Sequence, residues 1–207
     1  MSHGASLLMS NLPRHVRSFI AINLPPAVLV KVAEFQSELR AAVPRDCVRW
    51  TQPEQIHLTL RFLGNIAEGE LSQVEDALRR GCRGVGPFAA RARGAGCFPD
   101  LRRPRILWVG FDGALEPLMH LQAAVTRETG PWGEREEREF HPHLTLGRVK
   151  RASRELASAL ARHLEQAGQR DFGSWPVEQV DLMQSDLSSA GPRYTRLAGV
   201  RLAAGSV

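Results

Sequence analysis

Apolar residues recur along the chain with two spacings, and these predict a regular alternation of strands and helices. Short apolar or alternating runs bounded by turn residues are typical of strands, and they occur at residues 17–24, 48–52, 56–64, 88–96, 105–111, 140–149, 176–187 and 193–203. Apolar residues three and four positions apart predict amphipathic helices at residues 27–42, about 67–80, about 114–129 and around Leu156, Leu160 and Leu164. The expected order is β-α-β-β-α-β followed by β-α-β-α-β-β.

Each half of this order combines helices with strands, and each half contains one strand that carries the tetrapeptide HLTL. This pattern favours an α+β fold with two similar lobes, although the halves share little other sequence. Residues 1–14 are expected to form a loose tail, and residues 15–203 a single bilobal domain. The charged stretch at residues 130–139 is expected to be a solvated connection.

The composition is that of an ordinary globular protein. The 207 residues are 43% apolar and 24% charged, which is sufficient to bury a sizeable core. The apolar run Ala5–Met9 is too short to span a membrane and lacks the long apolar region of a secretory signal. Cys47, Cys82 and Cys97 are odd in number and widely spaced, so neither a disulfide framework nor a structural zinc site is predicted. A reducing cytoplasm is the expected location.

The net charge is positive and is carried almost entirely by arginine. The formal charge is +5 and the pI about 9.8, and Lys31 and Lys150 are the two lysines among 27 basic residues. Arginine binds phosphate oxygens through a planar fork of donors, whereas codon bias in a GC-rich genome would also raise its frequency. The charge favours a nucleic acid or nucleotide as partner over an acidic protein.

The tetrapeptide HLTL occurs at residues 57–60 and again at residues 143–146. Because successive side chains on a strand point to opposite faces, each copy places its two leucines on one face and its His and Thr on the other. One such His-Thr pair is usually a structural hydrogen-bonded pair. Two pairs on related strands predict instead a shared pocket with two imidazoles and two hydroxyls.

The same alternation predicts which face of the strand the residues next to each motif point to. On the first strand it places Arg61 on the face of His57, and Phe62 on the apolar face. On the second strand it places His141 beside His143. Arg148 follows the second motif off the His143 face, so it would need a bulge or a strand end to reach the pocket.

Two imidazoles and two hydroxyls suit displacement at phosphorus. Imidazole titrates near neutrality, so one His can accept a proton from a nucleophile while the other donates a proton to a leaving group. The hydroxyls can donate hydrogen bonds to the non-bridging oxygens, whose charge grows in the transition state. This chemistry requires neither a metal nor another cofactor.

Other site chemistries lack their motifs in this sequence. The P-loop pattern G-x-x-x-x-G-K-[ST] is absent, and so are H-E-x-x-H and G-x-S-x-G. The pair His141 and His143 resembles two metal ligands, but no Asp or Cys lies at a useful spacing from it.

The two HLTL motifs and the sequence around them resemble those of a known family. The chain resembles the two-histidine (2H) phosphoesterases, and among them the RNA 2′,3′-cyclic phosphodiesterase family, also called the 2′-5′ RNA ligase family. Two His-x-Thr-x motifs are that family's hallmark. The surrounding text agrees, in the expected order over about residues 16–203: RSFIAINLP, VRWTQPEQIHLTLRFLG, CFPDLRRPRILWVG, FHPHLTLGRV and LMQSDLSSAGPRYTRLA.

The resemblance implies a bilobal α+β fold with helices outside antiparallel strands and the active site in the cleft between the lobes. The implied reaction opens a 2′,3′-cyclic phosphate at an RNA 3′ end, or in a small cyclic nucleotide, to a 2′-phosphomonoester. Joining of such an end to a 5′-hydroxyl without ATP is a related reaction. By analogy His57 is the general acid and His143 the general base, while Thr59, Thr145 and Arg148 hold the phosphate.

Alternatives remain at this stage. The substrate could be a 2′-5′ oligoadenylate or ADP-ribose cyclic phosphate, and a non-catalytic RNA-binding module is the alternative from another class. No membrane and no obligate protein partner are expected. Arg61 is expected to contact phosphate or solvent, and His141 to be exposed with substrate contact as the alternative. We expect three aromatic residues in the core, namely Trp50, Trp108 and Phe98. His120 and His163 are expected at the surface, and Tyr194 is a residue that could stack on a base.

Overall fold

The computed structural model describes residues 14–113, 115–133, 139–188 and 191–204. The expected tail therefore lies outside the described residues apart from residue 14, and so does the centre of the expected connection at residues 130–139. The helices are α1 (Pro26–Ala42), α2 (Leu71–Cys82), α3 (Leu115–Glu128) and α4 (Arg154–Gln166). The strands are β1 (His15–Asn23), β2 (Val48–Trp50), β3 (His57–Ala67), β4 (Phe88–Phe98), β5 (Ile106–Asp112), β6 (His143–Val149), β7 (Asp171–Val177), β8 (Gln179–Ser188) and β9 (Gly191–Arg201).

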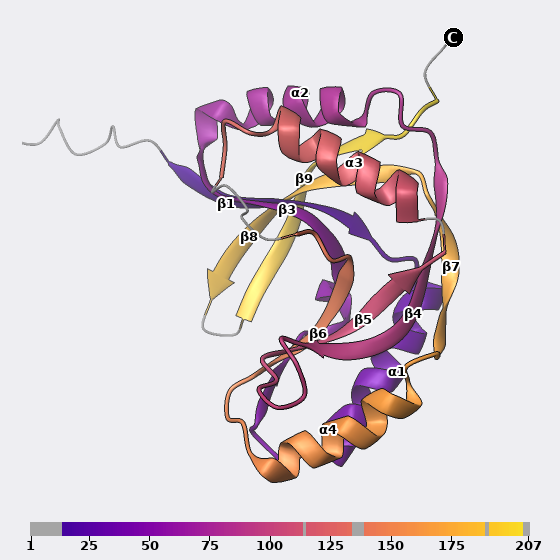
Figure 1. The fold of residues 1–207 in the computed structure, drawn as a ribbon. Helices are drawn as coiled ribbons and strands as arrows, with labels where there is room; N and C mark the ends of the chain where they lie inside the picture. Colours follow the sequence, from indigo (N-terminus) through magenta and orange to yellow (C-terminus); the bar gives the residue numbers. More distant parts are fainter. Residues whose placement is uncertain (1–13, 114, 134–138, 189–190, 205–207) are drawn as a thin grey trace, which may run out of the picture.

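All of these strands join one antiparallel sheet. Its order is β7-β4-β5-β6-β3-β1-β8-β9, and β2 pairs with β6 beside this path. The sheet is strongly curled, with α2 and α3 outside one half and α1 and α4 outside the other (Figure 1). The expected α+β fold with helices packed outside antiparallel strands is confirmed.

The two halves of the sheet do not correspond to two halves of the sequence. One half consists of β3, β1, β8 and β9, so both ends of the chain contribute to it. Helix α1 follows β1 in sequence, yet it packs against β7 and α4 in the other half. The chain therefore crosses between the lobes, and a simple division into two consecutive units does not describe the fold.

The strand β7 was not predicted by the sequence. A single strand was expected at residues 176–187, whereas the chain forms β7 and then β8. Gly173 and Pro176 weaken the strand pattern of β7, and a proline is tolerated there because β7 is the edge strand next to β4. Phe172 and Trp175 nevertheless point into the core and anchor the strand.

The core lies between the convex face of the sheet and the helices. Leu58, Leu60, Leu144 and Leu146 of the two HLTL motifs are all at most 1% exposed. Burying each of these side chains stabilises the fold by about 1.5–3 kcal/mol. The apolar halves of the two motifs therefore fix the strands whose opposite faces carry His and Thr.

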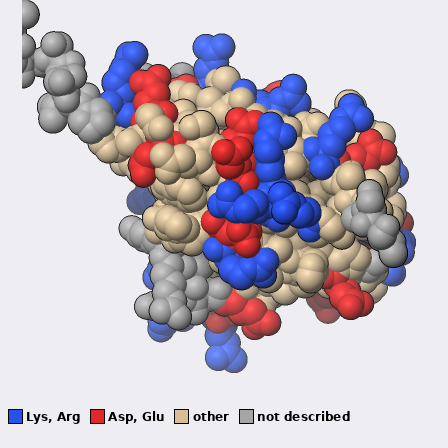
Figure 2. Space-filling model, turned by 90° about the horizontal axis from the view of Figure 1, so that it is seen from above, with Lys and Arg blue, Asp and Glu red and all other residues tan. Residues whose placement is uncertain are grey.

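The outer surface over α2 and α3 carries mixed charge. Figure 2, which views the molecule from that side, shows basic and acidic groups next to each other. Ion pairs on these helices join Arg79 to Glu75 and Arg80 to Glu128. Among the helices that the structure describes, none is long and apolar enough to cross a membrane.

Candidate active site

The two HLTL strands lie side by side in the sheet. Leu58 of β3 pairs with Leu144 of β6 in antiparallel orientation, and this is the register contact between the two strands. Extended by one residue to each side, this register sets His57 opposite Thr145, and Thr59 opposite His143. The two histidines are therefore diagonal neighbours on one face, with about 7–8 Å between such positions.

Each histidine is oriented by a backbone carbonyl two residues before it. The Nδ1 atom of His57 lies 2.8 Å from the carbonyl oxygen of Gln55, and that of His143 lies 2.7 Å from the carbonyl oxygen of His141. A carbonyl can only accept a hydrogen bond, so Nδ1 carries the hydrogen in both rings. In both histidines Nε2 is consequently the atom that can take up or release a proton.

Burial lowers the pKa of both imidazoles. It lowers the pKa of His57, against the opposing effect of the backbone hydrogen bond to Gln55. The Phe19 ring stacks on His57 with centroids 4.7 Å apart, and Tyr194 meets it edge-on at 5.3 Å. Burial likewise lowers the pKa of His143, and there the positive charges of Arg148 and His141 act in the same direction.

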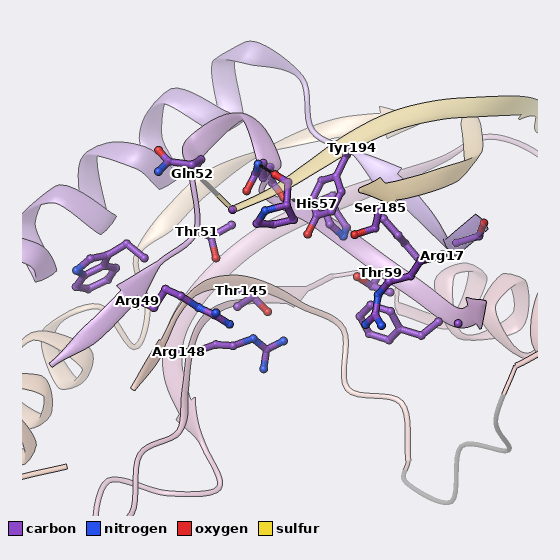
Figure 3. A pocket seen from close by; sticks show the side chains of 18 residues that line it. Arg17, Arg49, Thr51, Gln52, His57, Thr59, Thr145, Arg148, Ser185 and Tyr194 are labelled. Atoms are coloured by element: carbon purple, nitrogen blue, oxygen red, sulfur yellow. Dashed lines mark hydrogen bonds between the residues drawn. The ribbon is translucent and has the colours of Figure 1, made fainter. Parts of the chain in front are cut away.

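A pocket of about 550 Å³ opens over this face of the sheet. His57, Thr59, Thr145 and Arg148 line it, together with Arg17, Arg49, Thr51, Gln52, Ser185 and Tyr194 (Figure 3). His143 lies beside the pocket and contributes no lining atoms; its register partner Thr59 does. Among the described residues that line the pocket, none carries a carboxylate. The three arginines therefore favour an anionic ligand.

A bulge in β6 turns Arg148 toward the pocket. The register with β5 shifts between Gly147, which pairs with Leu107, and Thr145, which pairs with Trp108. Leu146 and Gly147 are consequently both buried, and Arg148 emerges on the face of His143 and Thr145. Glycine is required after the motif, because a Cβ at Gly147 would lie 2.8 Å from Val48 Cγ1.

Arg148 faces a second arginine across the sheet. Arg49 of β2 is its direct antiparallel partner. Like charges in this position repel each other, and within the described residues neither forms an ion pair. A bound phosphate would relieve this repulsion.

A matching bulge in β3 corrects two expectations. Ala21 pairs with Thr59 and Ile20 with Arg61, so Leu60 is the extra residue and the alternation of faces reverses after it. Arg61 is only 4% exposed, does not line the pocket and donates hydrogen bonds to the Trp132 carbonyl and other groups. Phe62, expected in the core, is 53% exposed and lines the pocket.

Two buried glutamines hold the two bulges. The Gln36 side chain of α1 donates hydrogen bonds to the carbonyl oxygens of Leu146, at 2.8 Å, and Thr51, at 2.7 Å. The Gln122 side chain of α3 donates one to the carbonyl oxygen of Leu60 at 3.3 Å. The last leucine of each HLTL motif is thus held in the same way, and the site has approximate twofold symmetry.

This symmetry is broken at one position. Five residues after its histidine, the first motif presents Phe62 to the pocket, whereas the second presents Arg148. At this position the second motif therefore contributes a cation to the pocket and the first motif an aromatic ring.

Several aromatic residues that were expected in the core are half-buried and line cavities instead. Trp50 lines the pocket described above, and Phe98 and Trp108 line a second one. Their positions on the concave face follow from pairing, since Trp108 is the cross-strand partner of Thr145.

The histidines outside the two motifs lie away from the first pocket. His141 is exposed, as expected, and lines the second pocket. His120 is exposed on α3 and His163 is half-buried on α4, and neither lines either pocket. The expectation of a surface position is therefore confirmed for His120 and holds in part for His163.

The ionisable groups of the described residues offer no obvious metal site. No three side chains among their His, Cys, Asp and Glu residues are grouped so that they could hold a metal ion. Arg17, Arg49, Gln36 and Gln122 were not predicted as site residues, because single polar residues outside the repeated motif give no signal in the sequence.

Comparisons with known proteins agree with this geometry. The family model described as LigT like Phosphoesterase matches residues 22–108 and 111–194. A protein of Methanothermobacter thermautotrophicus named RNA 2′,3′-cyclic phosphodiesterase is 37% identical over 188 residues, covering 90% of this chain and 99% of the relative. A protein of the same name from Archaeoglobus fulgidus is 32% identical, covering 88% of this chain and 98% of the relative.

Solved structures share the fold. A crystal structure of a Thermus thermophilus protein has a TM-score of 0.71 at 32% identity, covering 92% of this chain and 100% of that one. A crystal structure of Escherichia coli LigT complexed with 3′-AMP has a TM-score of 0.72 at 23% identity, covering 91% and 99%.

Proposed function

Because the chain belongs to the LigT-like phosphoesterase family, we propose that it hydrolyses the 2′,3′-cyclic phosphate at RNA 3′ ends to a 2′-phosphomonoester. Relatives that carry the name RNA 2′,3′-cyclic phosphodiesterase support this substrate. The single observation that carries the proposal is the diagonal pair of His-Thr motifs at the β3–β6 contact. It offers two proton-exchanging Nε2 atoms and two hydroxyls on one face of the sheet.

In the proposed reaction, the phosphate lies between the histidines and accepts hydrogen bonds from the hydroxyls of Thr59 and Thr145. His143 Nε2 takes a proton from water as the water oxygen forms a bond to phosphorus. The bond from phosphorus to the 3′-oxygen breaks, and His57 Nε2 gives that oxygen a proton. Arg148 and Arg49 offset the negative charge of the phosphoryl oxygens.

The surroundings of the two histidines support this division of roles. Arg148 and His141 lower the pKa of His143, and no such cationic effect acts on His57. These two cations favour the neutral form of His143, which is the form that the proposed base requires. Phe62 and Tyr194 offer ring faces in the same pocket for the terminal nucleobase.

The same site would also support joining of RNA ends. If a 5′-hydroxyl replaces water, His143 takes its proton and the product carries a 2′-5′ phosphodiester, without ATP. We expect the reaction to need no metal or other cofactor, and we expect neither an obligate protein partner nor a membrane. A cytoplasmic location also stays a prediction.

The test is product analysis with purified protein in EDTA. The substrates are 2′,3′-cyclic mononucleotides, RNA ending in a 2′,3′-cyclic phosphate, 2′-5′ oligoadenylate and ADP-ribose cyclic phosphate. We expect cyclic ends to give 2′-phosphates and the linear oligoadenylate to stay intact. Turnover of oligoadenylate or ADP-ribose cyclic phosphate alone would replace the proposed substrate. Loss of activity in EDTA, restored by a metal ion, would overturn the metal-free mechanism. RNA binding that survives without turnover of any substrate would favour the binding module.

A further inference from the structure

A second pocket lies directly behind His143. It has a volume of about 430 Å³, within the range of small-molecule sites. Its lining residues come from β4, β5, the start of α3, the segment before β6 and the turn after α4, and they include Arg93, Phe98, Trp108, Asp112, His141 and Gln169. The reaction proposed above uses none of these side chains.

Strand pairing places this pocket next to the phosphate position. Trp108 is the cross-strand partner of Thr145, and Gly110 is the partner of His143. Because neighbouring strands are about 4.8 Å apart, a phosphate held by Thr145 lies about one strand away from the indole of Trp108. The strands β4, β5 and β6 run side by side here (Figure 1). The reacting phosphate is at the 3′ end of the chain, and the preceding nucleotide is joined to the terminal one through the 5′-oxygen of its ribose. An RNA end with its terminal nucleotide in the first pocket could therefore extend its preceding nucleotide into the second.

The near end of the pocket is aromatic. The ring centroids of Phe98 and Trp108 are 5.2 Å apart, and those of Phe98 and His141 are 6.2 Å apart. Two glycines let the indole lie flat on the sheet: a Cβ at Gly96 would lie 2.4 Å from the Trp108 ring, and one at Gly110 would lie 3.1 Å from it. A flat ring with one open face is the surface on which nucleobases stack.

The far end of the pocket is polar. Arg93 and Asp112 form an ion pair of 3.0 Å there, and Gln169 is exposed at the rim. This pair offers both donors and acceptors, which suits the edge of a base or the hydroxyls of a ribose. Because Arg93 is neutralised by Asp112, this end does not favour a second free anion. An aromatic end and a polar end together match a nucleoside.

We propose that the second pocket binds the nucleotide on the 5′ side of the reacting 3′-terminal nucleotide. The inference rests on the proposed function, since it assigns the substrate phosphate to the space between Thr59 and Thr145. The enzyme then recognises an RNA end of at least two nucleotides, with the terminal base in the first pocket and the preceding base on Trp108, Phe98 and His141. A cyclic mononucleotide occupies only half of the site.

The test compares a 2′,3′-cyclic mononucleotide with a dinucleotide that ends in the same 2′,3′-cyclic phosphate. We expect the wild-type kcat/KM to be about 5- to 150-fold higher for the dinucleotide, the range that stacking of one base supplies. Gln169→Trp, which fills the rim, and His141→Ala should each reduce this ratio toward one. Gln166→Trp, at the exposed end of α4, and His120→Ala, on α3, are the matched controls and should preserve it.

A binding measurement separates failure of this inference from failure of the proposed function. The probes are the dinucleotide with a terminal 2′-phosphate and the corresponding mononucleotide 2′-phosphate, titrated calorimetrically. Tighter binding of the dinucleotide, lost in Gln169→Trp, supports the second pocket even if no substrate is hydrolysed. Equal kcat/KM and equal affinity for one and two nucleotides overturn the inference, although turnover would still support the proposed function. If the variants impair only joining to a 5′-hydroxyl RNA, the pocket holds the other strand and the assignment is wrong.

Discussion

His57 donates a hydrogen bond from Nδ1 to the carbonyl oxygen of Gln55, 2.8 Å away, and His143 does the same to His141 at 2.7 Å. Two catalytic candidates are thus fixed by backbone carbonyls just before their strands and not by carboxylates. Neither imidazole forms an ion pair within the described part of the chain, so burial lowers the pKa of both rings against the effect of the backbone hydrogen bonds alone.

Loss of either imidazole should abolish most of the activity. We expect His57→Ala and His143→Ala each to lower kcat by about 10²–10⁴-fold, the usual contribution of general acid–base catalysis. The double variant should be little worse than the single ones, since the two groups act together. His163→Ala on α4 is the control. Thermal unfolding of each variant checks that the fold is intact, and a folded variant with near wild-type kcat would contradict the assignment.

The pH dependence should be bell-shaped with its maximum on the acid side. Catalysis needs one neutral and one protonated imidazole, and the pKa values of both are lowered from 6.5 in the free protein. The profile of kcat/KM, which reports the free enzyme, should therefore peak below pH 6.5. A maximum well above that pH would contradict these pKa shifts.

Arg148→Gln tests which histidine is the base. Arg148 lowers the pKa of His143, so its removal should raise that pKa. If His143 must be neutral, the acidic limb of the kcat/KM profile moves to higher pH. Movement of the basic limb instead would exchange the two roles. Arg151→Gln, an exposed position outside both pockets, serves as the charge-matched control.

The two threonine hydroxyls should matter for turnover more than for folding. Thr59→Val and Thr145→Val keep the shape of the side chain and remove the donor to the phosphate. Because a hydrogen bond to a charged group contributes about 1.5–3 kcal/mol, we expect kcat/KM to fall by about 10- to 150-fold. Thr→Ser at either position keeps the hydroxyl and should retain most of the activity. Activity that is lost in the Ser variants but retained in the Val variants would mean that the methyl group, not the hydroxyl, is required.

The two glutamines allow a matched pair of variants. Gln36 is 3% and Gln122 8% exposed, and each supports the bulge after one HLTL motif. Replacing either with Leu removes side-chain hydrogen bonds from buried carbonyl groups, although the Leu146 carbonyl keeps the one from the Thr51 N–H. We expect each variant to lose about 1–3 kcal/mol of unfolding free energy. Gln36→Leu should in addition weaken phosphate binding, because its bulge directs Arg148. Gln122→Leu, whose bulge directs Phe62, should not. Urea unfolding and phosphate titration measure the two effects separately.

Strand alternation predicted the orientation of the site residues that precede the bulge in each HLTL strand. It placed both His-Thr pairs on one face and both Leu pairs in the core, as the structure has them. It failed at Arg61 and Phe62, because a bulge depends on contacts with distant residues such as Gln122 that the local pattern does not contain. The need for a bulge before Arg148 was recognised, since its position otherwise conflicted with its expected role.

The pairing of strands that are distant in the sequence was the part of the structure least predictable from the sequence. The interleaving of the lobes depends on β1 pairing with β8, a contact between opposite ends of the chain. Trp108 and Phe98 were assigned to the core because large aromatic residues usually are buried. Their position on the concave face follows only from the register of β5 with β6 and β4.

The contact between Leu58 and Leu144 also determines how firmly the two halves of the sheet are joined. It is the register contact at which the two halves of the sheet meet, so backbone hydrogen bonding is sparse where the substrate would lie. A phosphate that accepts hydrogen bonds from Thr59 on one strand and Thr145 on the other would bridge the halves across this narrow junction. The substrate itself then acts as a cross-link, and the lobes are held together most firmly while the phosphate remains between them.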